Sequence, residues 1–230
     1  MTTKSEQTRT AIIDAALALF REKGYDATTM RAIAAEAGVS VGNAYYYFSS
    51  KEQLIQGFYD RVYEEHSAAV RSVLERTTDL TERIVGVGDL WLTLMDPYRP
   101  FAGKFFKNAA EPTSPLSPFS PESAPAREAS IAMWREVLET SDTKIAKRLQ
   151  ERLPQLLWLY FMGIVLFWVH DPSSDASASR QVLRRTAPLV VKAIGLARLP
   201  VMRGVIDDVV GLVDDVGGYF ERKPPSESPD

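Results

Sequence analysis

The 230-residue chain contains no cysteine and only two histidines, His66 and His170. The absence of cysteine excludes disulfides, thiolate zinc sites, iron–sulfur ligation and a cysteine nucleophile. Two histidines cannot build a histidine-rich metal centre. His170 and Asp171 are adjacent in the sequence, so their side chains do not face each other as an acid–base pair would. We therefore predict a protein that is not an enzyme and that uses no metal and no cofactor.

Long hydrophobic runs are also missing. The longest, Leu156 to Val169, has 14 residues, whereas a membrane-spanning helix needs about 20. Residues 1–7 are polar and lack the apolar stretch of a secretory signal. We therefore predict a soluble, cytoplasmic protein with no membrane partner.

An excess of positive charge is absent as well. The chain has 27 Lys and Arg against 30 Asp and Glu, a net charge of −3, and residues 1–51 carry six basic and five acidic side chains. This balance excludes a broad positive field, so any contact with nucleic acid must come from a few well-placed groups. The apolar fraction of 45% and the charged fraction of 25% are typical of a folded globular chain.

Strand-like alternation is nearly absent, whereas helical spacing recurs along the whole chain. An all-α fold is therefore predicted, with a short helix after Thr28 and Thr29 and further helices at residues 8–22, 41–47, 50–75, 79–95, 98–110, 126–140, 144–170, 176–198 and 201–219. In the last of these, valines at 201, 205, 209, 213 and 216 are expected to share one side. The five prolines of residues 111–125 exclude a helix interior and predict a loop or extended segment, which serves as a connector, a lid or a docking site. Residues 221–230 are predicted to form a disordered tail.

The turn at Ala37-Gly38-Val39-Ser40 separates two short predicted helices. Glycine supplies a positive φ, and Ser40 is a typical N-cap for the helix that follows. Such a glycine-containing turn is typical of a helix-turn-helix, although spacing alone equally permits a plain corner between two bundle helices. Ser49 and Glu52 have the spacing of a capping box that opens the long helix from about residue 50.

Residues 9–54 resemble the N-terminal domain of TetR-family transcriptional regulators over their whole length. The resemblance rests on the segments AIIDAALALF (11–20), KGY (23–25), TTMRAIA (28–34) and AGVSVGNAYYYFSSKEQL (37–54). Ala32 and Ala44 depart from the usual pattern, and Ala44 affects how the third helix seats on the core. The resemblance implies a helix-turn-helix DNA-binding domain at residues 1–52 and a larger helical domain at residues 53–220 that binds an effector and dimerises.

The third helix offers chemistry that suits a DNA groove. Asn43 can pair bidentately with adenine, and Val41 offers a methyl surface to thymine. Gly42 costs about 0.5–1 kcal/mol in a helix relative to alanine, a cost that a close approach to DNA would justify. Family members place phosphate-binding groups at the positions of Tyr45, Tyr47 and Lys51. The candidate DNA contacts are Thr29, Arg31, Ser40, Val41, Gly42, Asn43, Tyr45, Tyr46, Tyr47 and Lys51.

The C-terminal region is rich in aromatic side chains, which favours an apolar effector pocket between helices. The candidate effector contacts are Trp91, Phe105, Trp134, Trp158 and Met162. The strongly apolar helices near residues 144–170 and 176–198 are predicted to form the homodimer interface, which would place two recognition helices one DNA turn apart on a palindromic operator. We expect a repressor that a small, hydrophobic effector releases. The alternative is a regulator or adaptor that a protein partner controls, and a fully packed C-terminal core would favour it.

Overall fold

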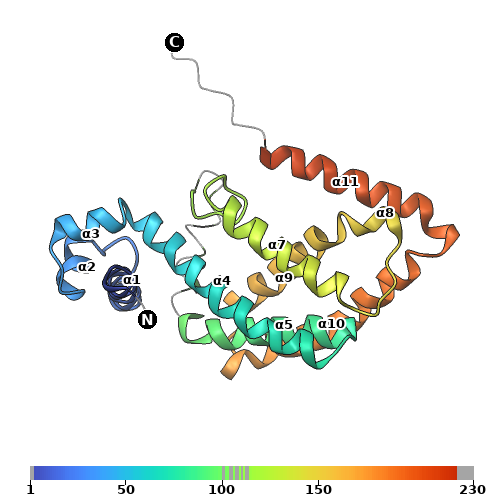
Figure 1. Cartoon of the computed structure of the whole chain (residues 1–230), viewed down its shortest axis with the longest axis horizontal. Helices are drawn as coiled ribbons and strands as arrows, with labels where there is room; N and C mark the ends of the chain where they lie inside the picture. The colour runs from blue at the N-terminus through green and yellow to red at the C-terminus, as the bar shows by residue number, and fades with distance from the viewer. Residues whose placement is uncertain are drawn as a thin grey trace, which may run out of the picture.

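The computed structural model describes residues 3–99, 102–103, 106, 109, 111 and 114–221. Every regular element in this part of the chain is a helix, which confirms the predicted all-α class. Three helices form a head at one end, and a larger bundle forms the rest of the molecule (Figure 1). A single long helix leads from the head into the bundle.

The head consists of α1 (Lys4–Lys23), α2 (Met30–Glu36) and α3 (Val41–Tyr47). Local capping defines these helices. The caps of α2 and α3 are the predicted ones, whereas α1 begins at Lys4 and not at residue 8, because Thr3 and Glu6 form a capping box. The hydroxyl of Thr29 accepts a hydrogen bond from Ala32 N at the start of α2, and that of Ser40 accepts one from Asn43 N at the start of α3. Gly38 has φ 68° in the turn between them, a conformation that favours glycine.

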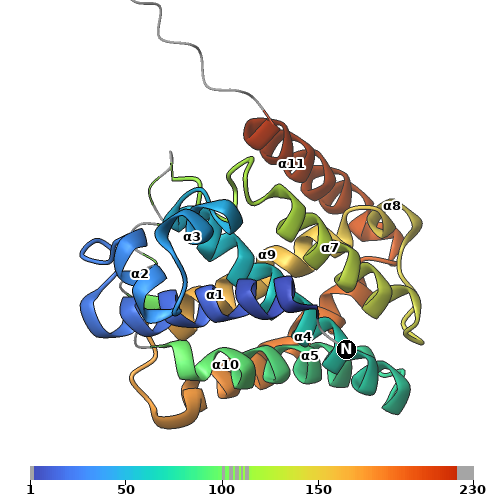
Figure 2. The same ribbon diagram turned by 60° about the vertical axis from the view of Figure 1, so that its left-hand side comes forward.

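The head is held together by the apolar sides of its three helices. Ile33 and Ala44 are fully buried, and Phe48 is 2% exposed. Gly57, on α4, lies so close to the rest of the head that a β-carbon there would stand 2.9 Å from the ring of Phe48, at the end of α3, and 3.3 Å from Ile13 of α1. This close approach is where α1 crosses the long helix (Figure 2). It fixes the orientation of the head on that helix.

Helix α4 (Lys51–Arg76) passes through the domain boundary expected at residues 52 and 53 and joins the two regions. The predicted capping box is wrong by one residue, because Ser50 and not Ser49 is the N-cap and its hydroxyl accepts from Gln53 N. The amide of Gln53 reaches back to Ser49 N over 2.9 Å. Glu52 is therefore left to accept a hydrogen bond from the hydroxyl of Tyr25, at 2.6 Å.

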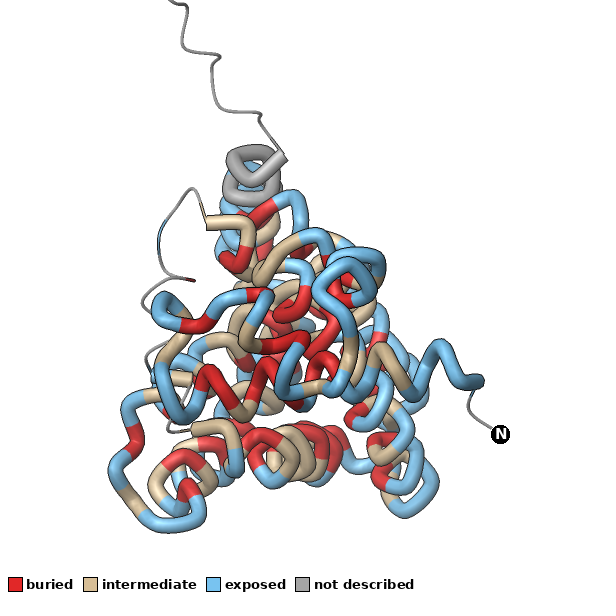
Figure 3. The backbone as a smooth tube through the Cα atoms, turned by 90° about the vertical axis from the view of Figure 1, so that its left-hand side faces the viewer, coloured by how far each residue is buried: buried red, intermediate tan, exposed pale blue. Residues whose placement is uncertain are grey.

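The bundle contains the second half of α4 together with α5 (Leu80–Met95), α7 (Ala124–Glu139), α9 (Leu153–Val169) and α10 (Ser177–Leu196). Two glycines let α5 pack tightly between α4 and α10. A β-carbon on Gly86 would stand 2.8 Å from Val73 of α4, and one on Gly88 would stand 2.6 Å from Leu183 of α10. Figure 3 shows buried residues where helices face one another and exposed residues around them.

The connection between α5 and α7 begins with η1 (Asp96–Tyr98), and the described residues that follow up to 109 are helical, within the predicted range 98–110. Residues 114–123, here called the Ser-Pro segment, form successive turns and no extended stretch. In these turns Ser117 N donates to Ser114 O, and Ser120 N donates to Ser117 O, both at 3.0 Å. Proline follows each of these serines and suits the second position of such turns.

The single helix predicted at residues 144–170 is wrong. The structure has a one-turn helix, α8 (Lys147–Gln150), and then α9, which begins at Leu153. Pro154 stands in the first turn of α9, where its missing N–H costs no hydrogen bond and where it prevents the helix from continuing backwards. The chain turns between α9 and α10 through η2 (Ser174–Ala176), in which Asp175 and Ala176 have φ values of 52° and 51°.

After η3 (Pro200–Met202), helix α11 (Arg203–Glu221) lies along the outside of the bundle beside α8 (Figure 1). The predicted valine side is wrong. Ile206 and Val213 are the buried residues, whereas Val205 and Val209 are exposed. The predicted disordered tail lies outside the described residues except for Glu221. Among the helices that the structure describes, none is both long enough and apolar enough to cross a membrane.

Candidate functional site

The outer face of α3 is exposed along its whole length, and its inner face is buried. Tyr46 is 82% exposed, Tyr45 50% and Val41 38%, and the side chain of Asn43 and the backbone of Gly42 are also open to solvent. Nothing lies within 4 Å of a β-carbon built on Gly42. Exposed tyrosine and valine side chains on a small helix are costly to leave in water, so this face has the character of a contact surface.

Three further candidate DNA contacts flank this face. Thr29 and Ser40 are exposed and cap α2 and α3, so their hydroxyls lie at the two helix N-termini. Arg31, in the first turn of α2, is exposed and takes part in no ion pair within the described chain. Helix N-termini and free guanidinium groups are the groups that bind phosphates.

The remaining two candidates are already engaged within the head. The hydroxyl of Tyr47 lies 3.1 Å from Ser5 Oγ. The ammonium group of Lys51 donates to Tyr25 O over 2.7 Å and lies 4.3 Å from the centre of the Tyr25 ring. Lys51 therefore ties the start of α4 to the loop after α1, which the sequence pattern did not reveal.

Glu52 and Tyr25 form a second contact between the start of α4 and the loop after α1. Burial alone would raise the pKa of Glu52, but hydrogen bonds from Tyr25 and Ser50 outweigh it and hold that pKa below its usual range. The pKa of Tyr25 is raised by burial and by its hydrogen bond to the carboxylate. The pair stays as a neutral phenol and a carboxylate at neutral pH, and it anchors α4 to the head.

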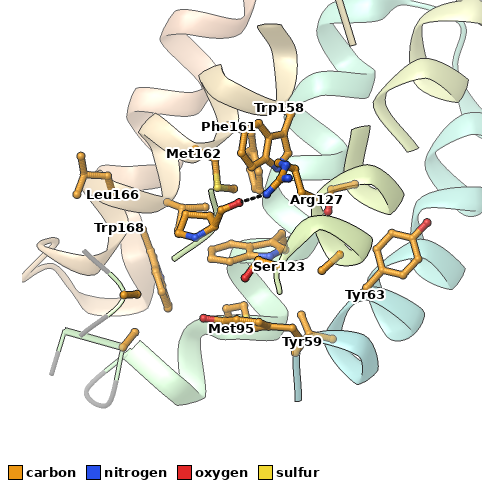
Figure 4. Close-up of a pocket in the computed structure, with 18 of the residues that line it drawn as sticks. Tyr59, Tyr63, Met95, Ser123, Arg127, Trp158, Phe161, Met162, Leu166 and Trp168 are labelled. Carbon is orange, nitrogen blue, oxygen red and sulfur yellow. Dashed lines mark hydrogen bonds between the residues drawn. The ribbon is translucent and has the colours of Figure 1, made fainter. Parts of the chain in front are cut away.

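A cavity of about 440 Å³ lies in the bundle, between α4, α5, α7, α9 and the Ser-Pro segment (Figure 4). This volume lies within the range of small-molecule sites. Of the candidate effector contacts, Trp91, Trp134, Trp158 and Met162 line the cavity, and Phe105 lies outside the described residues. Trp168 also lines it, so all four tryptophans of the chain surround one space.

Aromatic contacts shape the wall of the cavity. Trp91 stands edge-on to Phe161 at 5.5 Å and to Trp168 at 5.1 Å between ring centres. Phe119 of the Ser-Pro segment stands edge-on to Trp158 at 5.6 Å. The Ser-Pro segment is thus a wall of the cavity as well as a connector, a role that its proline pattern left open.

Few polar groups reach this space. His66 of α4 donates from Nε2 to Val87 O at 2.9 Å, and burial holds its pKa below the usual value, so it is neutral at pH 7. Arg127 of α7 donates from Nη1 to Pro118 O at 2.8 Å and to Ser120 O at 3.1 Å. Gln56 of α4 is not among the residues that line the cavity, but it donates from Nε2 to Pro115 O and to Ser123 Oγ, both at 3.2 Å. The Ser-Pro segment is therefore bonded to both α7 and α4.

Exposed apolar side chains also lie on α9 and α10. Phe167 is 43% exposed on α9, and Leu189 is 60% exposed on α10. The two helices are joined by a hydrogen bond of 2.7 Å between the hydroxyls of Tyr160 and Thr186. A β-carbon on Gly163 would meet nothing within 4 Å. These apolar side chains are exposed, and the surface at Gly163 is open to close approach.

Comparison with known families decides what kind of chain this is. A family model described as bacterial regulatory proteins of the tetR family matches residues 12–57. A second model, described as the tetracyclin repressor-like C-terminal domain, matches residues 83–212, which is more than half of the chain. The chain belongs to the TetR family. This finding confirms the resemblance of residues 9–54 and extends TetR character to the bundle, and the family is one of transcriptional regulators.

Individual relatives match over about a third of this chain. The HTH-type transcriptional repressor KstR2 of Rhodococcus jostii (strain RHA1) is 38% identical over 76 residues, 31% of this chain and 37% of that protein. The HTH-type transcriptional regulator UidR of Escherichia coli (strain K12) is 37% identical over 75 residues, 33% of this chain and 38% of that protein. The matched part thus spans well under half the length of these relatives.

Solved structures match over a longer stretch. The crystal structure of the TetR transcriptional regulator from Nitrosomonas europaea ATCC 19718 has a TM-score of 0.62 and 22% sequence identity, covering 79% of this chain and 96% of that one. At this identity the match shows a shared TetR fold, with a helical head and a helical bundle.

Proposed function

We propose that this TetR-family chain is a DNA-binding transcriptional repressor that acts in the cytoplasm as a homodimer on a palindromic operator and is released by a small effector. The observation that carries DNA binding is the outer face of α3, where Asn43, Tyr45 and Tyr46 project from a head that is otherwise packed. Asparagine reads adenine in the major groove, and the tyrosine hydroxyls suit phosphates. The description of KstR2 as a repressor supports the sign of regulation.

Dimerisation would use the apolar surface of α9 and α10. The exposed Phe167 and Leu189 favour a partner that removes them from water, and Gly163 allows helix backbones to approach closely. A two-fold axis through this surface would pair two heads on successive turns of DNA, about 34 Å apart. A dimer also makes twice as many phosphate contacts as one head, which compensates for the weak positive charge of a single head.

Effector release would act through α4. This helix carries Tyr59, Tyr63 and His66 into the cavity and is anchored to the head by Lys51 at its other end. A ligand that binds more tightly when α4 is shifted favours an arrangement with a different spacing of the two heads. It can shift the equilibrium between the two arrangements by no more than its difference in affinity for them. The cavity of about 440 Å³ supports a small-molecule effector over control by a protein partner.

Genomic footprinting with the purified protein, followed by operator binding across a range of salt concentrations, tests the proposal. We expect Asn43→Ala to reduce discrimination between operator and unrelated DNA, at about 1–3 kcal/mol for the lost base contact. Arg31→Ala should weaken binding to all sequences alike and lower the salt slope by about one. Lys51→Ala is a poorer probe, because it also removes the bond to Tyr25. Wild-type binding by both the Asn43 and Arg31 variants would refute the assignment of α3 and α2.

A further inference from the structure

The charges around the cavity are strongly unequal. Among the described residues that line it, no side chain is acidic and one is cationic, Arg127. The other titratable lining groups are His66, whose Nε2 is bonded to a backbone carbonyl, and three tyrosines. The rest of the lining is aromatic or aliphatic apart from two serine hydroxyls, Ser123 and Ser130. A cationic ligand would find no counter-charge among these described lining residues.

Arg127 itself lacks an acidic partner in the part of the chain that the structure describes. Its Nη1 donates to two carbonyl oxygens of the Ser-Pro segment, Pro118 O and Ser120 O, and its Nε and Nη2 make no hydrogen bond to a described residue. Figure 4 shows Arg127 among the side chains that line the cavity, with one bond to a backbone oxygen drawn. This half-buried guanidinium is bonded to neutral carbonyls, so no described acidic group balances its positive charge. Two of its three nitrogens remain available to donate to a ligand.

From these features we propose that the cavity takes an amphipathic organic anion, with an apolar body among the tryptophans and a carboxylate-type head group on Arg127. A carboxylate accepts two parallel hydrogen bonds from a guanidinium, and such charge-assisted bonds are about twice as strong as neutral ones. The apolar walls raise this strength further, because they exclude water from the pair. The proposal rests on the proposed function, in which this cavity holds the effector.

The same arginine links the head group to the rest of the molecule. Arg127 holds the Ser-Pro segment from one side, and Gln56 of α4 holds it from the other. An anion that draws the guanidinium toward itself competes with Pro118 O and Ser120 O for the donors of Arg127. The Ser-Pro segment then passes the change to α4 five residues after Lys51, close to the head.

A matched series of ligands tests the head group with the full-length protein and no DNA. Decanoate, 1-decanol and decylammonium share one apolar chain and differ in charge. Because all four tryptophans line the cavity, intrinsic fluorescence reports its occupancy, and calorimetry measures each affinity. We expect decanoate to bind at least about tenfold more tightly than decanol, and decylammonium to bind most weakly. Equal or tighter binding of decanol or decylammonium would overturn the proposal, and so would a lack of binding by all three.

Two arginine variants on one helix locate the effect. Arg127→Gln should remove the preference for decanoate over decanol, whereas Arg135→Gln, which deletes an exposed charge of α7, should keep it. If Arg127→Gln does not fold, Arg127→Lys retains a charge without the paired donors and should give an intermediate preference. An unchanged preference in the Arg127 variants would overturn the assignment. Footprinting without any ligand tests operator binding separately, so failure there refutes the proposed function and leaves the ligand result standing.

Discussion

Asp171 provides a sharp test of what holds the turn between α9 and α10. Its carboxylate is 6% exposed and accepts four hydrogen bonds. Oδ1 accepts from Ser173 N at 2.9 Å and Ser173 Oγ at 2.6 Å, and Oδ2 accepts from Ser179 N at 2.8 Å and Ser179 Oγ at 2.6 Å. These bonds hold a turn in which Asp175 and Ala176 both have the left-handed φ that costs non-glycine residues about 1–2 kcal/mol each.

The pKa of Asp171 shows how much its hydrogen bonds contribute to the stability of the fold. Burial alone would raise it, but the hydrogen bonds from Ser173 and Ser179 prevail and lower the pKa from 3.8 to about 2. At about 1.4 kcal/mol for each tenfold change in proton affinity, the folded state favours the carboxylate by about 2 kcal/mol. Because the folded pKa is the lower one, this stability is present above about pH 4 and is lost as the pH falls through about 2.

The variant Asp171→Asn should therefore lower the free energy of unfolding by about 2–3 kcal/mol at pH 7, since its amide N–H₂ cannot accept from Ser179. Urea unfolding at fixed protein concentration measures the difference. At pH 3 the difference in free energy of unfolding between wild type and variant should be about half as large, because protonation of Asp171 in the unfolded wild-type chain reduces the stability that the carboxylate provides. Asp175→Asn, at an exposed position of the same turn, should change stability by less than about 0.5 kcal/mol. A gap that is equal at both pH values would refute this account of Asp171.

Three other substitutions address the proposed sites. Gly42→Ala should stabilise α3 by about 0.5–1 kcal/mol in thermal melting, since the added methyl group meets nothing, and should weaken operator binding by standing between α3 and DNA; unchanged operator affinity would contradict the close approach. Gln56→Leu, which cuts α4 from the Ser-Pro segment, should leave operator affinity nearly unchanged and reduce its response to effector about fivefold; a full response would remove the segment from the coupling. Phe167→Asp should shift the protein toward monomer in sedimentation equilibrium, and an intact dimer would place the interface elsewhere.

The head was predictable because its signals are local. Thr29 and Ser40 cap helices that begin one residue later, and Gly38 supplies the positive φ of the turn. The start of α4 shows the limit of such signals, because Ser49 and Ser50 are both suitable caps by type. In the structure Ser50 is the N-cap, and Glu52 accepts a hydrogen bond from Tyr25. That contact joins residues 27 apart in the sequence, so a local capping pattern does not reveal it.

The bundle was predicted less well because periodicity alone places its helices imprecisely. In α11 the valines recur every four residues, and four residues exceed one helical turn by about 40°. A row with that spacing drifts around the helix, so Val205 and Val209 face solvent while Val213 is buried. Spacings of three and four in alternation keep one face, as Ile206 and Val213 do, seven residues apart.

Three polar residues of the bundle could not be predicted from patterns of charge, because they bind backbone carbonyls and hydroxyls. Arg83 is 2% exposed and donates to Leu74 O, Thr77 O, Val137 O and the hydroxyl of Thr140. Its position among the apolar residues of α5, between Leu80 and Val87, is the one sign in the sequence that it is buried. Looking for oppositely charged partners in the sequence therefore identifies none of Arg83, Arg127 and Gln56.

The difference among these three lies in what remains unsatisfied. All three guanidinium nitrogens of Arg83 donate hydrogen bonds at the ends of α4 and α7. Arg83 therefore joins those helix ends and has no nitrogen left for a ligand. Arg127 uses one nitrogen and lines a cavity. A half-buried charge with free donors beside an apolar space is more stable with an anion than without one. This contrast between two arginines is the physical reason for expecting an anionic ligand at Arg127 and none at Arg83.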